Sequence, residues 1–130
     1  MPRVLCRCPV EVRASRGERF FGQVSDISRG GIGLLVDAVA AIRLAPGGRI
    51  LGPAAPVVAV VLHRSGMGDS RPGIQLEGRI RHVRRLSQQQ YLIGVHFVDP
   101  DSVRHLVQQA IAAGQDWPAP LATVWGERLS

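Results

Sequence analysis

The sequence predicts a mostly β protein, an antiparallel barrel or sandwich followed by one α-helix. Six short segments, apolar or alternating, are separated by glycine-rich or polar turns, which is typical of antiparallel sheets. One stretch near the C-terminus has its apolar residues at helical spacing instead. At 130 residues the chain has the length of one domain. Aromatic residues make up only 5%, so Val, Ile, Leu and Ala must supply most of the core.

The first two predicted strands form a hairpin, because "VEVRA" alternates and "GERFFGQVSDI" follows it across a Ser-Arg-Gly turn. The last two form another hairpin, in which "YLIGVHFV" follows the polar turn "SQQQ". Two longer connections, 37–53 and 65–73, lie between them, and the first holds a helical turn in "VDAVAAIRL". The six predicted strands are 10–14, 17–27, 31–36, 57–62, 74–86 and 91–98.

The stretch "DPDSVRHLVQQAIAAG" predicts the helix, with Asp99 as N-cap, Pro100 at the first helical position and Gly114 as the stop. We expect its apolar stripe to be buried across the sheet. Residues 114–130, which hold both tryptophans, are expected to pack back on the domain or on a second subunit. The stripe consists of Val103, Leu106, Val107, Ala110 and Ile111.

The net charge of +6 comes entirely from arginine, since the sequence contains no lysine. Such a surface suits anionic partners: nucleotides, nucleic acid or acidic proteins. The longest apolar run, 57–62, is far shorter than the roughly 20 residues of a membrane span, and no signal-peptide run opens the chain. We therefore expect a cytoplasmic protein without a membrane span.

No arrangement of nucleophile and base, metal constellation or phosphate loop is evident, so we expect a protein that is not an enzyme and has no catalytic residues. Cys6 and Cys8 are predicted to be reduced and structural. A zinc site would need further ligands at suitable spacing, and the histidines are scattered, so neither metal nor cofactor is predicted. His82 and His96 are expected to be structural or surface residues, and Asp99 and Asp101 to serve helix capping.

The turn "SDISRGG" has side chains suited to guanine. The carboxylate of Asp26 can accept the two neighbouring N–H donors of the Watson–Crick edge, and the Ser28 hydroxyl can add a hydrogen bond. Gly31 lets the backbone approach a flat base and adopt dihedrals closed to other residues. Arg29, which could stack on a base, and Gly30 are secondary candidates. The simpler alternative is a turn whose Asp and Ser satisfy local backbone N–H groups.

Two arginines at spacing four, Arg3 and Arg7, open the chain. An arginine fork binds phosphate through two parallel hydrogen bonds, and it also matches O6 and N7 of guanine. On an N-terminal arm the two side chains could hold phosphate and guanine together. The simpler alternative is that both are solvated.

In this order, and on this strand-rich scaffold, the motifs resemble those of the PilZ domain family, bacterial receptors for cyclic di-GMP. The resemblance covers about residues 3–112. Arg3-Val-Leu-Cys-Arg7 resembles the RxxxR of the family's flexible arm, and Asp26-Ile-Ser28-Arg-Gly-Gly31 resembles its (D/N)xSxxG turn. Gly94 and Phe97 resemble the Gly-x-x-Phe of its closing hairpin.

The resemblance implies a six-stranded antiparallel β-barrel with a C-terminal helix packed on it. The domain would span residues 1–113, with 1–9 as a flexible arm, and 114–130 would be a tail. The implied cyclic di-GMP ligands are Arg3, Arg7, Asp26, Ser28 and Gly31, with Arg29 and Gly30 secondary.

The register of the arginine motif has an alternative. "PRVLCRCPVEV" also matches the phrase that surrounds the second arginine in many family members. In that register Arg3 is the second arginine, the first would lie before Met1, and Arg7 falls within the first strand.

The implied function is a cyclic di-GMP sensor whose arm is ordered by the ligand and which signals through an unidentified output protein, or through a second copy as a homodimer. The alternative is a degenerate adaptor that keeps the barrel, binds no cyclic di-GMP and acts by protein contacts. General nucleic-acid binding is a third alternative. However, the arginines at 79, 81, 84 and 85 lack interleaved aromatic residues and are expected to form a solvated strand face, so no specific nucleic acid is predicted.

Overall fold

The computed structural model describes residues 3–45, 57–62, 73–112 and 119–125. Gly114, the predicted helix stop, lies outside these ranges, as do 46–53 of the first long connection and 65–72 of the second. The strands are β1 (Val4–Leu5), β2 (Pro9–Ala14), β3 (Arg19–Ile27), β4 (Gly31–Asp37), β5 (Val57–Leu62), β6 (Ile74–Arg85) and β7 (Gln90–Phe97). The helices are α1 (Ala38–Leu44), α2 (Pro100–Ala112) and α3 (Ala119–Trp125).

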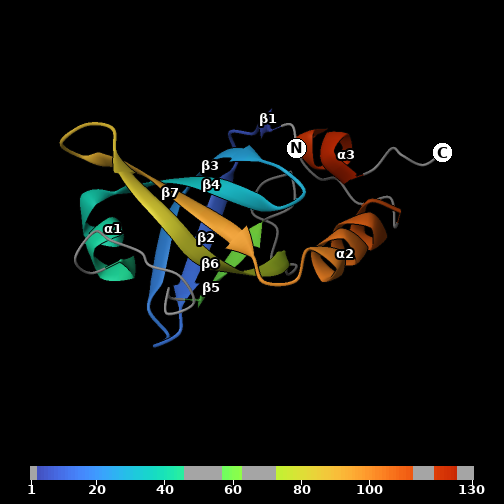
Figure 1. Cartoon of the computed structure of the whole chain (residues 1–130), viewed down its shortest axis with the longest axis horizontal. Coiled ribbons are helices and arrows are strands. Elements are labelled where there is room, and N and C mark those ends of the chain that lie inside the picture. The colour runs from blue at the N-terminus through green and yellow to red at the C-terminus, as the bar shows by residue number, and fades with distance from the viewer. Residues whose placement is uncertain (1–2, 46–56, 63–72, 113–118, 126–130) are drawn as a thin grey trace.

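Six of these strands close into an antiparallel barrel in the order β3-β2-β5-β6-β7-β4, with β4 returning to β3 (Figure 1). The long strand β3 closes the barrel, because it pairs with both β2 and β4. Its first half pairs with β2, and its second half pairs with β4. The short strand β1 pairs with the end of β3 beyond β2. The predicted six-stranded barrel with a C-terminal helix is confirmed.

Alternation along the strands separates the core from the outer face. In β4, Ile32, Leu34 and Val36 point inward and are buried. Of their partners in β7, Val95 and Ile93 are buried and Tyr91 is partly buried. Burying one such side chain stabilises the fold by about 1.5–3 kcal/mol. The aliphatic residues predicted to build the core therefore do so.

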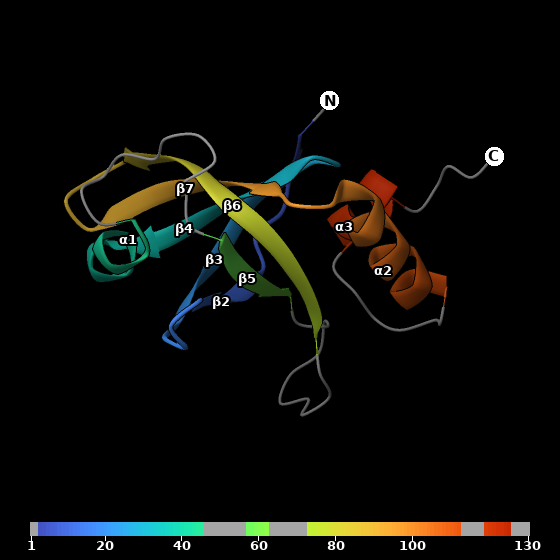
Figure 2. The same ribbon diagram turned by 60° about the horizontal axis from the view of Figure 1, so that its bottom comes forward.

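The helices cover opposite ends of the barrel (Figures 1 and 2). At one end, α1 begins at Asp37, whose side chain accepts a hydrogen bond from the Ala40 amide at 2.8 Å. At the other end, α2 packs against β6 and α3. Val103 and Val107 of the predicted stripe are buried, but Leu106 is 44% exposed, so its predicted burial is wrong. Ala110 and Ile111 are partly buried and pack against the core, so Leu106 is the one member of the predicted stripe that faces solvent.

The tail contributes α3, which packs against β1, β3 and α2. Leu121, Val124 and Trp125 are buried, and the Trp125 ring lies 6.3 Å from that of Phe97. Gln108 of α2 donates a hydrogen bond to the Trp125 carbonyl at 2.9 Å. Within the described ranges, no helix is long and apolar enough to cross a membrane.

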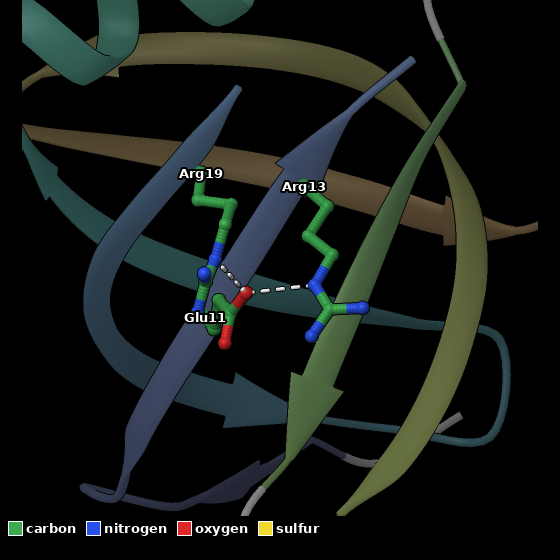
Figure 3. Close-up of polar contacts among 3 residues, drawn as sticks. All are labelled: Glu11, Arg13 and Arg19. Atoms are coloured by element: carbon green, nitrogen blue, oxygen red, sulfur yellow. Dashed lines mark hydrogen bonds and ion pairs between the residues drawn. The ribbon is translucent and has the colours of Figure 1, made fainter. Parts of the chain in front are cut away.

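A buried ion-pair group lies on the outer face of β2 (Figure 3). Only 4% of the Glu11 side chain is exposed, because the arginines on either side cover it. One carboxylate oxygen accepts from Arg13 Nε at 2.7 Å and from Arg19 Nε at 2.8 Å. The hydrogen bond from Arg13 is the main cause that lowers the pKa of Glu11, against the opposing effect of burial.

Candidate functional site

Two β-bulges interrupt the barrel. In β3, Val24 pairs with Leu34 but Asp26 pairs with Gly33, so Ser25 is the extra residue. In β6, Ile80 pairs with Val95 but His82 pairs with Gly94, so Arg81 is the extra residue. Such bulges redirect side chains and are common beside functional sites.

The two bulges flank one row of outward-facing residues: Asp26 on β3, Gly33 on β4, Gly94 on β7 and His82 on β6. We call these four positions the glycine row. A Cβ atom on Gly33 would lie 2.9 Å from Asp26 Oδ1, and one on Gly94 would overlap the His82 imidazole. The carboxylate and the imidazole therefore lean over neighbouring glycines. The backbone of Gly33 and Gly94 therefore forms a flat surface, which we call the glycine floor, and the carboxylate and the imidazole cover it from opposite sides.

Arg3 reaches this row from the N-terminal arm. Val4 and Leu5 pair with Ile27 and Asp26, and the Arg3 guanidinium donates a hydrogen bond to the Asp26 carboxylate. The arm is thus placed along β3 from Arg3 onward, while residues 1–2 lie outside the described ranges. The Asp26 side chain is 22% exposed and remains accessible from solvent.

The second predicted arginine lies apart from this contact. Arg7 is exposed and, within the part of the chain that the structure describes, makes no hydrogen bond or ion pair. The structure therefore brings Arg3, and not Arg7, to Asp26.

The neighbours of Arg7, Cys6 and Cys8, are both free cysteines, and their sulfur atoms lie 2.9 Å apart. The hydrogen bond between the two thiols lowers the pKa of Cys6 and raises the pKa of Cys8. Among the described residues, no group of three His, Cys, Asp or Glu is placed to hold a metal ion.

Ser28 and Gly31 close the turn between β3 and β4. The Ser28 amide donates to the Gly31 carbonyl at 2.9 Å, and the buried Ser28 hydroxyl donates to the same oxygen at 3.4 Å. A Cβ atom on Gly31 would overlap the Val95 carbonyl. The expectation of unusual dihedrals at Gly31 is wrong, since Gly17 alone among the described residues has a positive φ. Close approach of the backbone, not its dihedral angles, requires glycine at this position.

The remaining turn residues connect the turn to other elements. Arg29 Nε donates to the Val124 carbonyl of α3 at 3.2 Å. The Gly30 carbonyl accepts from the Phe97 amide of β7 at 3.0 Å. The side chain of Arg29 thus contacts the tail helix in this structure.

Positive charge gathers beside the glycine row. His96 pairs with Gly31 across β4 and β7 and lies on the outer face. Partial burial lowers the pKa of His96, and the charges of Arg81, His82 and Arg3 lower it further. The arm and the β6 bulge therefore add to the same electrostatic field.

Sequence reasoning placed Arg81 on a solvated face and treated His82 and His96 as structural or surface residues. A signal for the bulge was present in the sequence. Inward apolar residues recur every second position up to Ile80, and the next is Val83, three positions on. That change of phase predicts a bulge, and with it two consecutive outward side chains.

Comparison with known proteins identifies the family whose model matches this chain. The family model for the PilZ domain matches residues 1–113. No curated protein matches.

Several solved structures have a similar fold. The PilZ domain of CeSA from a cellulose-synthesizing bacterium is 14% identical with a TM-score of 0.49, over 88% of this chain and 99% of that one. The K. pneumonia MrkH complex with c-di-GMP is 18% identical with a TM-score of 0.50, over 86% of this chain and 49% of that one. The PilZ domain of YcgR from Escherichia coli, with c-di-GMP, is 12% identical with a TM-score of 0.48, over 87% of each chain. The chain thus spans about half the length of MrkH.

Proposed function

Because the chain belongs to the PilZ domain family, we propose that it is a sensor of cyclic di-GMP that signals through protein partners. PilZ domains are regulatory or adaptor domains and not enzymes. The observation that carries the proposal is the Asp26 carboxylate at the edge of the flat glycine floor. MrkH, whose fold is similar, was solved with c-di-GMP bound.

Each candidate residue has a defined part in this proposal. Asp26 accepts the two N–H donors of the guanine edge, and the glycine floor supports the plane of the base. Arg3 exchanges its ion pair with Asp26 for a bidentate contact with phosphate, and Arg7 adds a second guanidinium. Ser28 and Gly31 keep the turn closed so that Asp26 stays beside the floor.

The signal passes through the arm and the turn. The arm strand β1 packs against α3, and Arg29 in the turn contacts the same helix. A ligand that engages Arg3 and Asp26 changes how the arm lies on β3, and with it the surface that a partner protein contacts. The secondary candidates Arg29 and Gly30 act here by connecting the turn to α3 and β7.

Isothermal titration with cyclic di-GMP tests this function, with cyclic di-AMP as the ligand control. We expect saturable, guanine-selective binding. Asp26→Ala should weaken it about 100-fold, because two hydrogen bonds to a charged acceptor are lost. Asp101→Ala is the matched control, since it removes an exposed carboxylate from α2, and it should bind as the wild type does.

The two arginine variants test the register. Loss of binding in both Arg3→Ala and Arg7→Ala supports the literal RxxxR motif, whereas loss in Arg3→Ala alone supports the shifted one. A folded wild-type protein that gives no heat contradicts the sensor. It would favour the ligand-free adaptor, in which the Arg3–Asp26 ion pair permanently occupies the carboxylate.

A further inference from the structure

The bulge in β6 turns two consecutive side chains outward. In a regular strand, Arg81 and His82 would face opposite sides of the sheet. Here both are exposed, while Ile80 on one side is fully buried and Val83 on the other packs against the core. The barrel therefore carries two adjacent polar groups at a position where regular pairing allows one.

His82 lies on the surface that holds Asp26, and Arg81 is exposed directly before it at the bulge. The His82 imidazole lies over Gly94, which pairs directly with Gly33, and the Asp26 carboxylate lies over Gly33. Positions directly opposite in a sheet have Cβ atoms about 4.5–5.5 Å apart. The imidazole and the carboxylate consequently border one small floor from opposite sides.

Basic side chains outnumber acidic ones around this floor. Arg3, Arg81 and His82 all act electrostatically on His96, which stands beside the floor on β7. Asp26 is the acidic member of the glycine row, and it is already paired with Arg3. A positively charged field beside a neutral floor favours a ligand that combines a flat polar ring with an anionic group.

We propose that Arg81 and His82 form the second wall of this surface and bind the phosphodiester backbone of the nucleotide whose guanine Asp26 recognises. This inference rests on the proposed function. The Arg81 fork donates two parallel hydrogen bonds to one phosphate, and an imidazole N–H of His82 donates one more. To make its contact His82 turns away from Gly94, which frees the floor for the base.

Titration of cyclic di-GMP into the full-length protein and single variants tests the inference. Arg81→Ala should raise Kd about tenfold, in line with the loss of a charge-assisted contact, and His82→Ala should raise it about threefold. Arg84→Ala is the matched control. It removes an exposed arginine from the same strand, where Arg84 pairs with Leu92 outside the glycine row, and Kd should stay within about twofold.

The dependence on NaCl distinguishes a phosphate contact from a structural effect. Salt screens charge–charge attraction, so the wild-type Kd should rise steeply with NaCl, and that of Arg81→Ala less steeply. Arg81→Lys should recover part of the affinity, because it keeps the charge and loses the fork. A thermal melt of each variant checks the fold.

The outcomes separate the two proposals. If the wild type binds, and Arg81→Ala and His82→Ala bind as tightly as Arg84→Ala, the inference is overturned and the sensor function stands. If Arg81→Ala weakens binding but keeps the wild-type salt dependence, Arg81 does not contact phosphate. If the wild type does not bind at all, the proposed function fails, and the inference fails with it.

Discussion

At the scale of single residues, the outward-facing glycines differ in what a methyl group would meet. At Gly33 it would meet the end of the flexible Asp26 side chain, whereas at Gly31 it would meet the backbone carbonyl of Val95. We expect Gly33→Ala to weaken cyclic di-GMP binding at least tenfold by displacing the carboxylate, with unfolding free energy changed by no more than about 0.5 kcal/mol. Titration and urea denaturation on the same sample measure both quantities.

Gly31→Ala is the contrasting variant. The backbone must move to accept the methyl group, which costs about 1–3 kcal/mol of stability. A Gly33→Ala protein that is destabilised as much as Gly31→Ala would contradict the assignment of Gly33 to the floor.

The charge cluster at Glu11 gives a prediction for acid stability. Its pKa is lowered in the folded state, so its contribution to stability is complete above the ordinary value of 4.5 and is lost as pH falls through the lower folded value. We expect Glu11→Gln to cost about 1–2 kcal/mol at neutral pH. The variant should also lose less stability than the wild type on acidification. Urea denaturation at neutral pH and below pH 4.5 checks this; parallel pH profiles of the two proteins would contradict it.

At the scale of elements, the contact between the β3–β4 turn and α3 gives a prediction for Arg29. Its Nε satisfies the carbonyl of Val124 in the last turn of the helix. Arg29→Ala should therefore raise the hydrogen-exchange rates of α3 amides about threefold to tenfold, with those of β5 unchanged. Unchanged exchange in α3 would show that the contact does not stabilise the helix. A loss of ligand affinity without faster exchange would assign Arg29 to the ligand instead.

The elements show what the sequence could and could not predict. The apolar run Val57–Leu62 and the capped helix from Pro100 were predictable, because their patterns are local. The strand β1 was not, since two residues carry no period and its pairing with β3 is a tertiary interaction. The helix α3 has only seven residues and is stabilised by burial rather than by propensity.

The site was predictable only in part, for the same reason. The turn motif identified Asp26. The wall of Arg81 and His82 on the other side depends on the pairing between β6 and β7, which no local pattern predicts. The change of phase from Ile80 to Val83, and the matching one from Val24 to Ile27, were the available signals for both bulges. They indicate where side chains are redirected, but not that the two bulges share one row.

At the scale of the whole molecule, the tail helix is part of the core. Leu121, Val124 and Trp125 are buried against the barrel end and α2. A variant that ends at residue 113 should lose about 4 kcal/mol or more of stability, because each large buried apolar side chain contributes about 1.5–3 kcal/mol. Denaturation of this variant beside the full chain measures the difference. Equal midpoints and slopes would show that the barrel with α2 is self-sufficient.

Trp125 has a consequence for how this protein can be observed. The residue is 2% exposed, and its indole lies beside Phe97, in the helix that packs on the arm strand. Indole emission moves to longer wavelength when water reaches the ring, so the molecule carries its own optical reporter where arm, turn and tail meet. With Trp117→Phe as background, rapid mixing could follow any movement at this junction without an attached dye. Ligand binding and the later response of α3 could then be resolved as separate kinetic phases.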